Sequence, residues 1–129
     1  MIFREFLYLH KLKGNLRLKP LELEELQRKK LTAIVRQAYE NVPFYHKKLR
    51  QAGIKPDDIK TLSDMQKIPI TTRNELQSSS LKDLVASNVN PNTLIKETTS
   101  GSTGIPLTTF FSQKVKDFDR GNSYQTFFL

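Results

Sequence analysis

The chain has 129 residues, of which 37% are apolar and 26% are charged, and this is the composition of one ordinary folded domain. With no cysteine and only two histidines, the sequence excludes a disulfide framework, a cysteine nucleophile and a zinc site built on several histidines. The net charge of +8 comes mainly from residues 1–50, which hold 12 Lys/Arg against 5 Asp/Glu. We interpret this charge as the solvated side of helices and expect no nucleic-acid partner, because no RNA-binding motif or zinc-finger spacing accompanies it.

Residues 1–20 form a basic, weakly amphipathic segment that Gly14 and Asn15 interrupt. We expect a short helix packed on a larger body, with a membrane-surface or transit segment as the alternative. Arg4 and Glu5 interrupt the first apolar stretch. The sequence therefore predicts no signal peptide and no transmembrane segment, and it favours a cytoplasmic location.

A helical pattern follows over residues 21–40, where apolar side chains recur at helical spacing. These side chains are Leu31, Ile34, Val35 and Ala38. Pro43 is expected to separate this helix from a second one, because proline suits a first helical turn but not a helix interior. The second helix is predicted to stop at Gly53, since glycine accepts the left-handed conformation of a helix end.

Two capping boxes, in which the first and fourth residues of a helix start bond to each other, are predicted next. Ser63 with Gln66 would open one short helix, and Thr72 with Glu75 would open another. We expect the helix after Thr72 to continue as far as residues 84–85.

The pattern changes after Pro91. Residues 93–98 and 107–111 have strand character, and the chain becomes helical again beyond residue 112. It ends on three large apolar residues, whereas a natural terminus usually ends in polar ones. We therefore expect the front part of a longer protein with a mixed α/β fold, in which amino-terminal helices lead into the first strands of a larger sheet.

Between the two predicted strands lies the segment "TTSGSTGIP", which is rich in hydroxyls and glycines. Gly101 and Gly104 allow unusual backbone dihedrals and a close approach to a ligand. Ser100, Ser102 and Thr103 add hydroxyl donors to backbone N–H groups that together can form an anion-binding concavity. By composition alone such a cluster is more often a plain flexible turn, with a phosphate loop as the alternative, and the exact order of residues has to decide between them.

Better-known loops do not fit the spacing of this segment. A Walker loop would require a glycine five residues after Gly101, where Pro106 stands, followed by a lysine, and Thr103 breaks the dinucleotide fingerprint. A nucleophile elbow would require a glycine at position 100, where Ser100 stands.

"TSGSTGIP" instead resembles the phosphate-binding signature T-S-G-[ST]-T-G-x-P of the adenylate-forming enzymes. The stretch "AYENVPFYHKKLRQAGIKPDDIKTLSDMQKIPITTRNEL" is similar to the amino-terminal region of their phenylacetate–CoA ligase branch, which includes capsule-biosynthesis relatives. The resemblance covers about residues 25–115 and rests on two motifs in the right order.

The resemblance implies an enzyme that joins a small-molecule carboxylate to ATP, releases pyrophosphate and passes the acyl group to a thiol such as coenzyme A. The loop would bind the β- and γ-phosphates together with Mg²⁺. Its residues here are Thr99, Ser100, Gly101, Ser102, Thr103 and Gly104. The chain would then comprise a basic segment (1–20), a helical region (21–90) and the start of the nucleotide-binding sheet (91–129).

The sequence also departs from the family pattern. Ile105 stands where many relatives carry a lysine, and Arg73 stands where a lysine is common. The family's ribose-binding aspartate and late catalytic lysine have no counterparts, so we expect no catalytic residue and no metal ligand in this chain. We expect an inactive fragment of a ligase; the alternative is a truncated, non-enzymatic module whose basic helices bind a partner or a nucleotide.

Overall fold

The computed structural model describes residues 2–99, 106 and 108–128. Among these residues helices dominate, and a two-stranded antiparallel sheet accompanies them, which confirms the expected mixed α/β class. The elements in chain order are α1 (Ile2–Asn15), α2 (Pro20–Asn41), α3 (Pro43–Gln51), η1 (Pro56–Asp58), η2 (Ser63–Lys67), α4 (Arg73–Ser78), α5 (Leu81–Leu84), η3 (Pro91–Thr93), β1 (Ile95–Thr98), β2 (Thr108–Phe111) and α6 (Gln113–Phe128).

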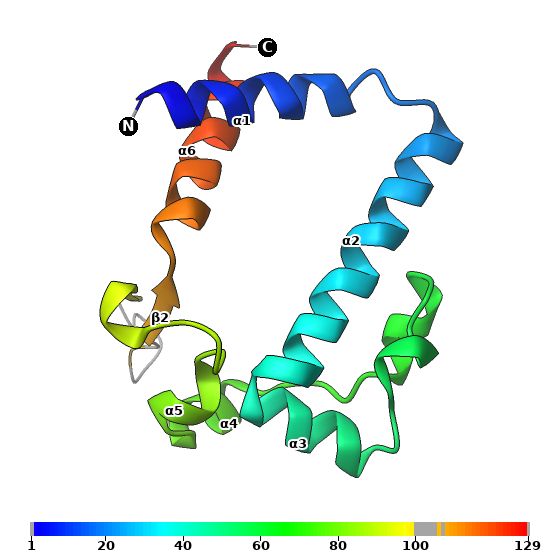
Figure 1. Cartoon of the computed structure of the whole chain (residues 1–129), viewed down its shortest axis with the longest axis vertical. Helices are drawn as coiled ribbons and strands as arrows, with labels where there is room; N and C mark the ends of the chain where they lie inside the picture. The colour runs from blue at the N-terminus through cyan, green and yellow to red at the C-terminus, as the bar shows by residue number, and fades with distance from the viewer. Residues whose placement is uncertain (1, 100–105, 107, 129) are drawn as a thin grey trace.

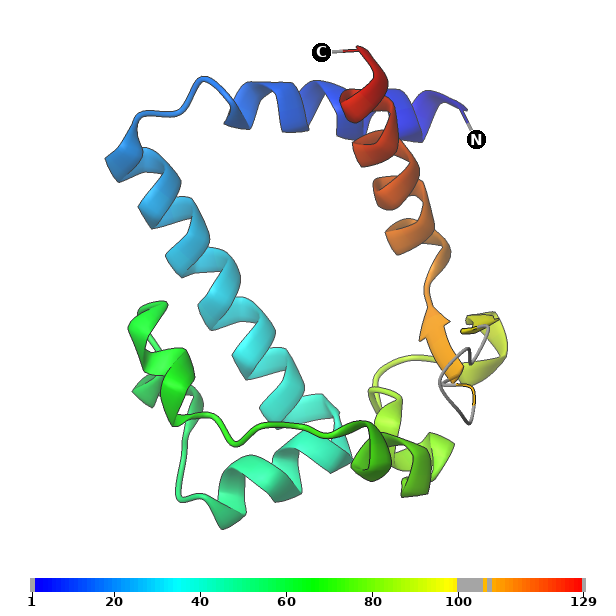
Figure 2. The ribbon, with the colours of Figure 1, turned by 180° about the vertical axis from the view of Figure 1, so that it is seen from behind.

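The elements follow one another around an open frame (Figure 1). Helix α2 forms one long side, α3 to α5 form the base, and α6 returns from the hairpin to α1. The view from behind shows the same arrangement, with the first and last helices crossing at one end (Figure 2). Segments from opposite ends of the sequence therefore meet in space.

The hydrophobic core lies at the base of α2, where α3 and the turn after it pack against this helix. Its buried members are Leu31, Val35, Leu49, Ile54 and Ile59. Tyr39 and Ile68 cover the edge of this cluster. Of the apolar residues whose spacing predicted α2, Leu31 and Val35 face the core, whereas Ile34 is 66% exposed.

The junctions around α3 agree with the sequence prediction. Val42 is extended and serves both as the end of α2 and as the start of α3, with Pro43 in the first turn. At the other end Gly53 has φ +70°, and the Ile54 N–H donates to the Leu49 carbonyl at 2.9 Å. This bond across the helix end holds Ile54 against the core.

The first predicted capping box is wrong, although a short helix does form there. Asp64 bonds back to the Thr61 N–H at 2.9 Å, and the Asp64 N–H donates to the Thr61 hydroxyl at 3.3 Å, so this pair replaces Ser63 and Gln66. A carboxylate accepts backbone N–H bonds more strongly than a neutral amide does. The Lys67 ammonium and nearby backbone N–H groups lower the pKa of Asp64 well below its usual range.

The second predicted box is confirmed, because Thr72 and Glu75 bond reciprocally. The continuous helix expected after it is wrong. Ser79 is extended and ends α4, and the Ser80 hydroxyl then accepts the Asp83 N–H at 3.3 Å to begin α5. Serines bond their own local backbone readily, and here they divide the segment into two short helices.

The two predicted strands and the predicted helix after residue 112 are also present. Strand β1 pairs antiparallel with β2, and Thr98 lies opposite Thr108. Helix α6 then packs against α1, where the Tyr8 and Phe118 rings meet edge to face with centroids 5.6 Å apart. Asp117 on α6 is only 1% exposed and accepts a 2.8 Å bond from Gln113. The first segment thus forms a helix, as expected, and it packs on α6 at a distance from the core.

Candidate functional site

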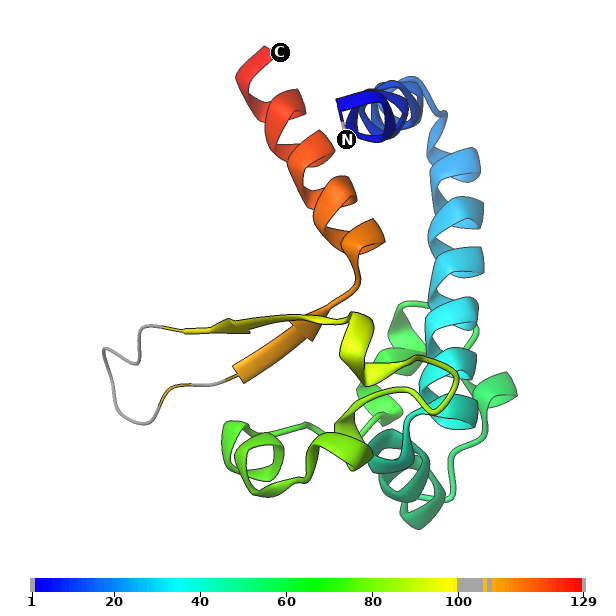
Figure 3. The same ribbon diagram turned by 60° about the vertical axis from the view of Figure 1, so that its left-hand side comes forward.

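The β1–β2 hairpin determines where the predicted phosphate loop must lie. The register places Thr98 opposite Thr108, with 3.3 Å between their hydroxyl oxygens, so the intervening segment joins the strands at this end. Figure 3 shows the hairpin projecting away from α2 and α3. At the far side of the segment, Gln77 of α4 donates to the Pro106 carbonyl at 3.5 Å.

Of the predicted phosphate-binding residues, Thr99 is described and is exposed beyond the end of β1. Ser100, Gly101, Ser102, Thr103 and Gly104 lie outside the described residues, as does Ile105. Their assignment to a phosphate therefore remains a prediction from the sequence.

Lys116 lies close to the hairpin but does not extend freely into solvent. Its ammonium donates to the Glu97 carboxylate of β1 and lies 4.5 Å from the centre of the Phe111 ring. The ion pair and the aromatic contact use this cation to attach α6 to the sheet.

A half-buried ion pair joins α3 to α4 on the other side of the hairpin. The Lys48 ammonium donates to both carboxylate oxygens of Glu75, at 2.7 and 2.9 Å, and to the Ile70 carbonyl at 2.7 Å. The Lys48 ammonium, followed by the N–H and hydroxyl of Thr72, lowers the pKa of Glu75 to about 2. One carboxylate therefore both caps α4 and attaches it to α3.

This ion pair makes stability sensitive to acid. Because the pKa of Glu75 is depressed in the folded state, its contribution is fully present above about pH 5 and is lost as the pH falls towards 2. The free energy of unfolding should fall less steeply with decreasing pH in Glu75→Gln, because roughly one fewer proton is taken up on unfolding in acid. Urea unfolding between pH 2 and 7 measures this slope. Lys48→Gln should reduce this slope only partly, because Thr72 still bonds the Glu75 carboxylate. Equal slopes in the native chain and both variants would contradict the role given to Glu75.

His46 has a structural role in the fold. Its Nδ1 lies 2.7 Å from the Tyr39 carbonyl oxygen, and the two rings pack with their planes tilted by 53° and their centroids 4.8 Å apart. Because a carbonyl only accepts, Nδ1 carries the proton of this bond. The ring is half-buried and joins the start of α3 to the end of α2.

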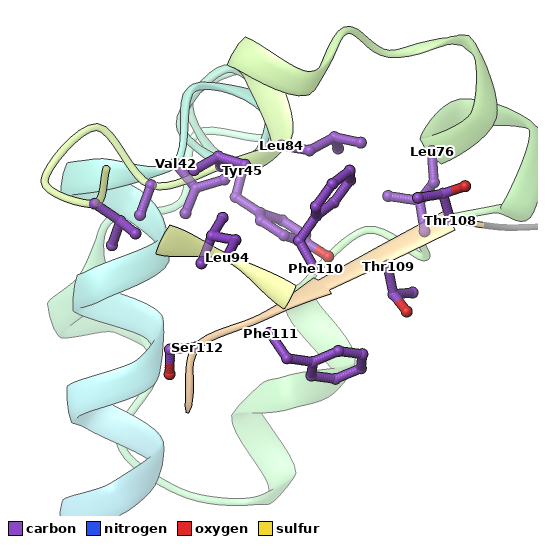
Figure 4. Close-up of a pocket in the computed structure, with 13 residues that line it drawn as sticks. Val42, Tyr45, Leu76, Leu84, Leu94, Thr108, Thr109, Phe110, Phe111 and Ser112 are labelled. Carbon is purple, nitrogen blue, oxygen red and sulfur yellow. The ribbon is translucent and has the colours of Figure 1, made fainter. Parts of the chain in front are cut away.

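An open apolar pocket of about 500 Å³ lies between β2 and the short helices. Thirteen residues line it, among them Tyr45, Leu76, Leu84, Val89, Leu94 and Phe110. Figure 4 shows Phe110 pointing toward Tyr45 and Leu84, while Thr109 and Phe111 lie on the opposite side of the strand. Sequence reasoning missed this pocket, although the alternating faces of a strand gave a partial signal.

Among the described residues, no three or more histidine, aspartate or glutamate side chains gather closely enough to hold a metal ion. Of the described helices, none combines the length and the apolar character needed to cross a membrane.

Comparison with curated proteins confirms the resemblance to the adenylate-forming enzymes. Within that class the similarity is to phenylacetate–coenzyme A ligases. The Escherichia coli ligase is 38% identical over 92 residues, which are 71% of this chain and 21% of the ligase. The Aromatoleum evansii ligase is 45% identical over 58 residues (45% and 13%), and the Pseudomonas putida ligase is 30% identical over 92 residues (70% and 20%). No family model matches the chain.

The similarity covers only a small part of each relative. The chain spans about a fifth or less of the length of these curated relatives. The similarity is therefore to a ligase-like part and not to a whole ligase.

Proposed function

We propose that this chain is the amino-terminal part of an AMP-forming acyl- or aryl-CoA ligase that activates a carboxylate with ATP as an acyl adenylate. The observation that carries the proposal is the 92-residue similarity to a phenylacetate–coenzyme A ligase. The order of the two sequence motifs supports it. The small-molecule carboxylate, ATP and coenzyme A would be substrates of the whole enzyme, which we expect in the cytoplasm.

In this proposal the chain supplies the phosphate loop. The antiparallel pairing of β1 with β2 brings Thr98 and Thr108 together, so a glycine- and hydroxyl-rich segment connects two adjacent strands. Backbone N–H groups and hydroxyls of Thr99 to Gly104 are suitable donors for the β- and γ-phosphate oxygens. Mg²⁺ usually keeps several waters and binds through phosphates, so it would share the charge there without a protein cage in this chain.

The chain supplies no nucleophile or base in this proposal. The substrate carboxylate attacks the α-phosphate, and the P–O bond to pyrophosphate breaks. The loop contributes by holding the leaving phosphates in position and stabilising their charge. The chain alone is therefore expected to show no ATP–pyrophosphate exchange.

A hybrid enzyme tests the proposal. It takes this chain up to the carboxyl end of its alignment with the Escherichia coli ligase and the Escherichia coli sequence from there on. We expect phenylacetate-dependent ATP–pyrophosphate exchange from the hybrid and none from the chain alone. A folded hybrid without exchange would contradict the proposal and favour the alternative, a non-enzymatic module that binds a partner or nucleotide through its basic helices.

A further inference from the structure

The apolar pocket beside the hairpin is accessible on the described part of the chain. Its lining comes from the start of α3, from α4 and α5, from the connection to η3 and from β2. These segments come together only in the fold, and they present apolar side chains to a shared space of about 500 Å³. Binding sites in proteins are usually concave and mostly apolar, with a few polar groups.

The strand that forms one wall of the pocket is also incompletely paired. Among the described residues, β2 pairs with β1, and the sheet has these two strands. All four residues of β2 are nevertheless half-buried, on both faces of the strand. Two strands alone are at most marginally stable, and an unpaired edge beside an apolar surface accepts a further extended segment.

The comparisons indicate what could cover this surface. The Escherichia coli ligase matches this chain over 21% of its length, so about four fifths of such an enzyme lie outside the match. The pocket is lined mostly by apolar residues, its polar groups are hydroxyls, and the basic residues of the first fifty positions do not line it. This chemistry suits an apolar protein segment better than a phosphate or a nucleic acid.

We propose that the pocket is the docking surface for the remaining part of an adenylate-forming ligase, an apolar segment of which inserts between Phe110 and Leu84. The proposal rests on the proposed function, because it takes the occupant from that enzyme. Val89 and Leu94 contact the inserted segment from the side, and the edge of β2 continues the contact along the backbone. The chain then binds this part even when the two are separate polypeptides.

Co-expression tests the docking. The full chain, carrying an affinity tag, is produced together with the Escherichia coli ligase from which the aligned segment and everything before it are removed. We expect the two polypeptides to be purified together in equal amounts. Leu84→Asp is expected to reduce the recovered ligase part at least tenfold, because a charge in the pocket loses its water on docking. Leu81→Asp is the matched control on the same helix, since Leu81 is 43% exposed and does not line the pocket.

Circular dichroism of each variant alone shows whether it folds, and Val89→Asp replaces Leu84→Asp if the latter does not. Recovery of no ligase part with the native chain would overturn the proposal, as would equal recovery with the pocket variant and the control. A dimer of the chain that the pocket variant abolishes would also overturn it, because a second copy would then be the occupant. Docking in the absence of hybrid exchange would refute the proposed function alone, while exchange without docking would refute only this inference.

Discussion

The hybrid ligase with Gly101→Ala and Gly104→Ala should exchange ATP and pyrophosphate about 100-fold or more slowly than the hybrid with the native loop, as when one oxyanion-hole donor is lost. In the proposed phosphate loop a methyl group at either position would obstruct the close approach of the backbone to a phosphate oxygen, and it would restrict the dihedrals available to the loop. The exchange rate at saturating phenylacetate, with ATP varied, measures the effect.

Two further variants separate the loop chemistry from a general loss of folding. In α1, a Cβ added at Gly14 would meet no atom within 4 Å, so Gly14→Ala makes the same chemical change at a harmless position. Its exchange rate should equal that of the native hybrid. Ser102→Ala keeps the backbone donors and should cost less than the glycine pair. If the glycine pair behaved like Gly14→Ala, the segment would be a plain turn.

Local signals predicted the helices around the core because the decisive interactions lie within a few residues. Proline at position 43 restricts its own φ wherever the chain goes, and glycine at position 53 accepts the positive φ that this helix end adopts. The same reasoning failed where several polar side chains compete for the same N–H groups. Thr61 and Asp64 took the capping role expected of Ser63 and Gln66, and Ser80 began a new helix inside a segment predicted as one continuous helix.

Contacts between distant parts of the chain were beyond the reach of local patterns. Lys48 and Glu75 are 27 positions apart, and Lys116 and Glu97 are 19 positions apart. The packing of α1 on α6 joins the two ends of the sequence. The periodicity of α1 or α6 does not identify the element that packs on it, since an amphipathic stripe indicates only that an apolar surface covers it. The apolar pocket was missed for the same reason, and the phosphate loop stays a prediction.

Ile59→Ala is expected to lower the free energy of unfolding by about 2–5 kcal/mol, the range for removing a fully buried branched side chain. Ile59 is 0% exposed and belongs to a cluster in which just five apolar residues of the described chain are buried. Because a whole domain is stable by only about 5–15 kcal/mol, this loss is a large share of the total. Urea unfolding followed by far-UV circular dichroism measures it.

Ile70→Ala is the matched control, because Ile70 is 87% exposed and bonds Lys48 through its backbone carbonyl, which the substitution keeps. Its change should stay within about 0.5 kcal/mol. Similar losses for both isoleucines would contradict the placement of the core.

Amide hydrogen exchange tests the same variant by region. Helices α2 and α3 contribute the core around Ile59, whereas α6 packs on α1 at the far end of the frame. Protection should therefore fall more in α2 and α3 than in α6, and a uniform fall would mean that the frame opens as one cooperative unit.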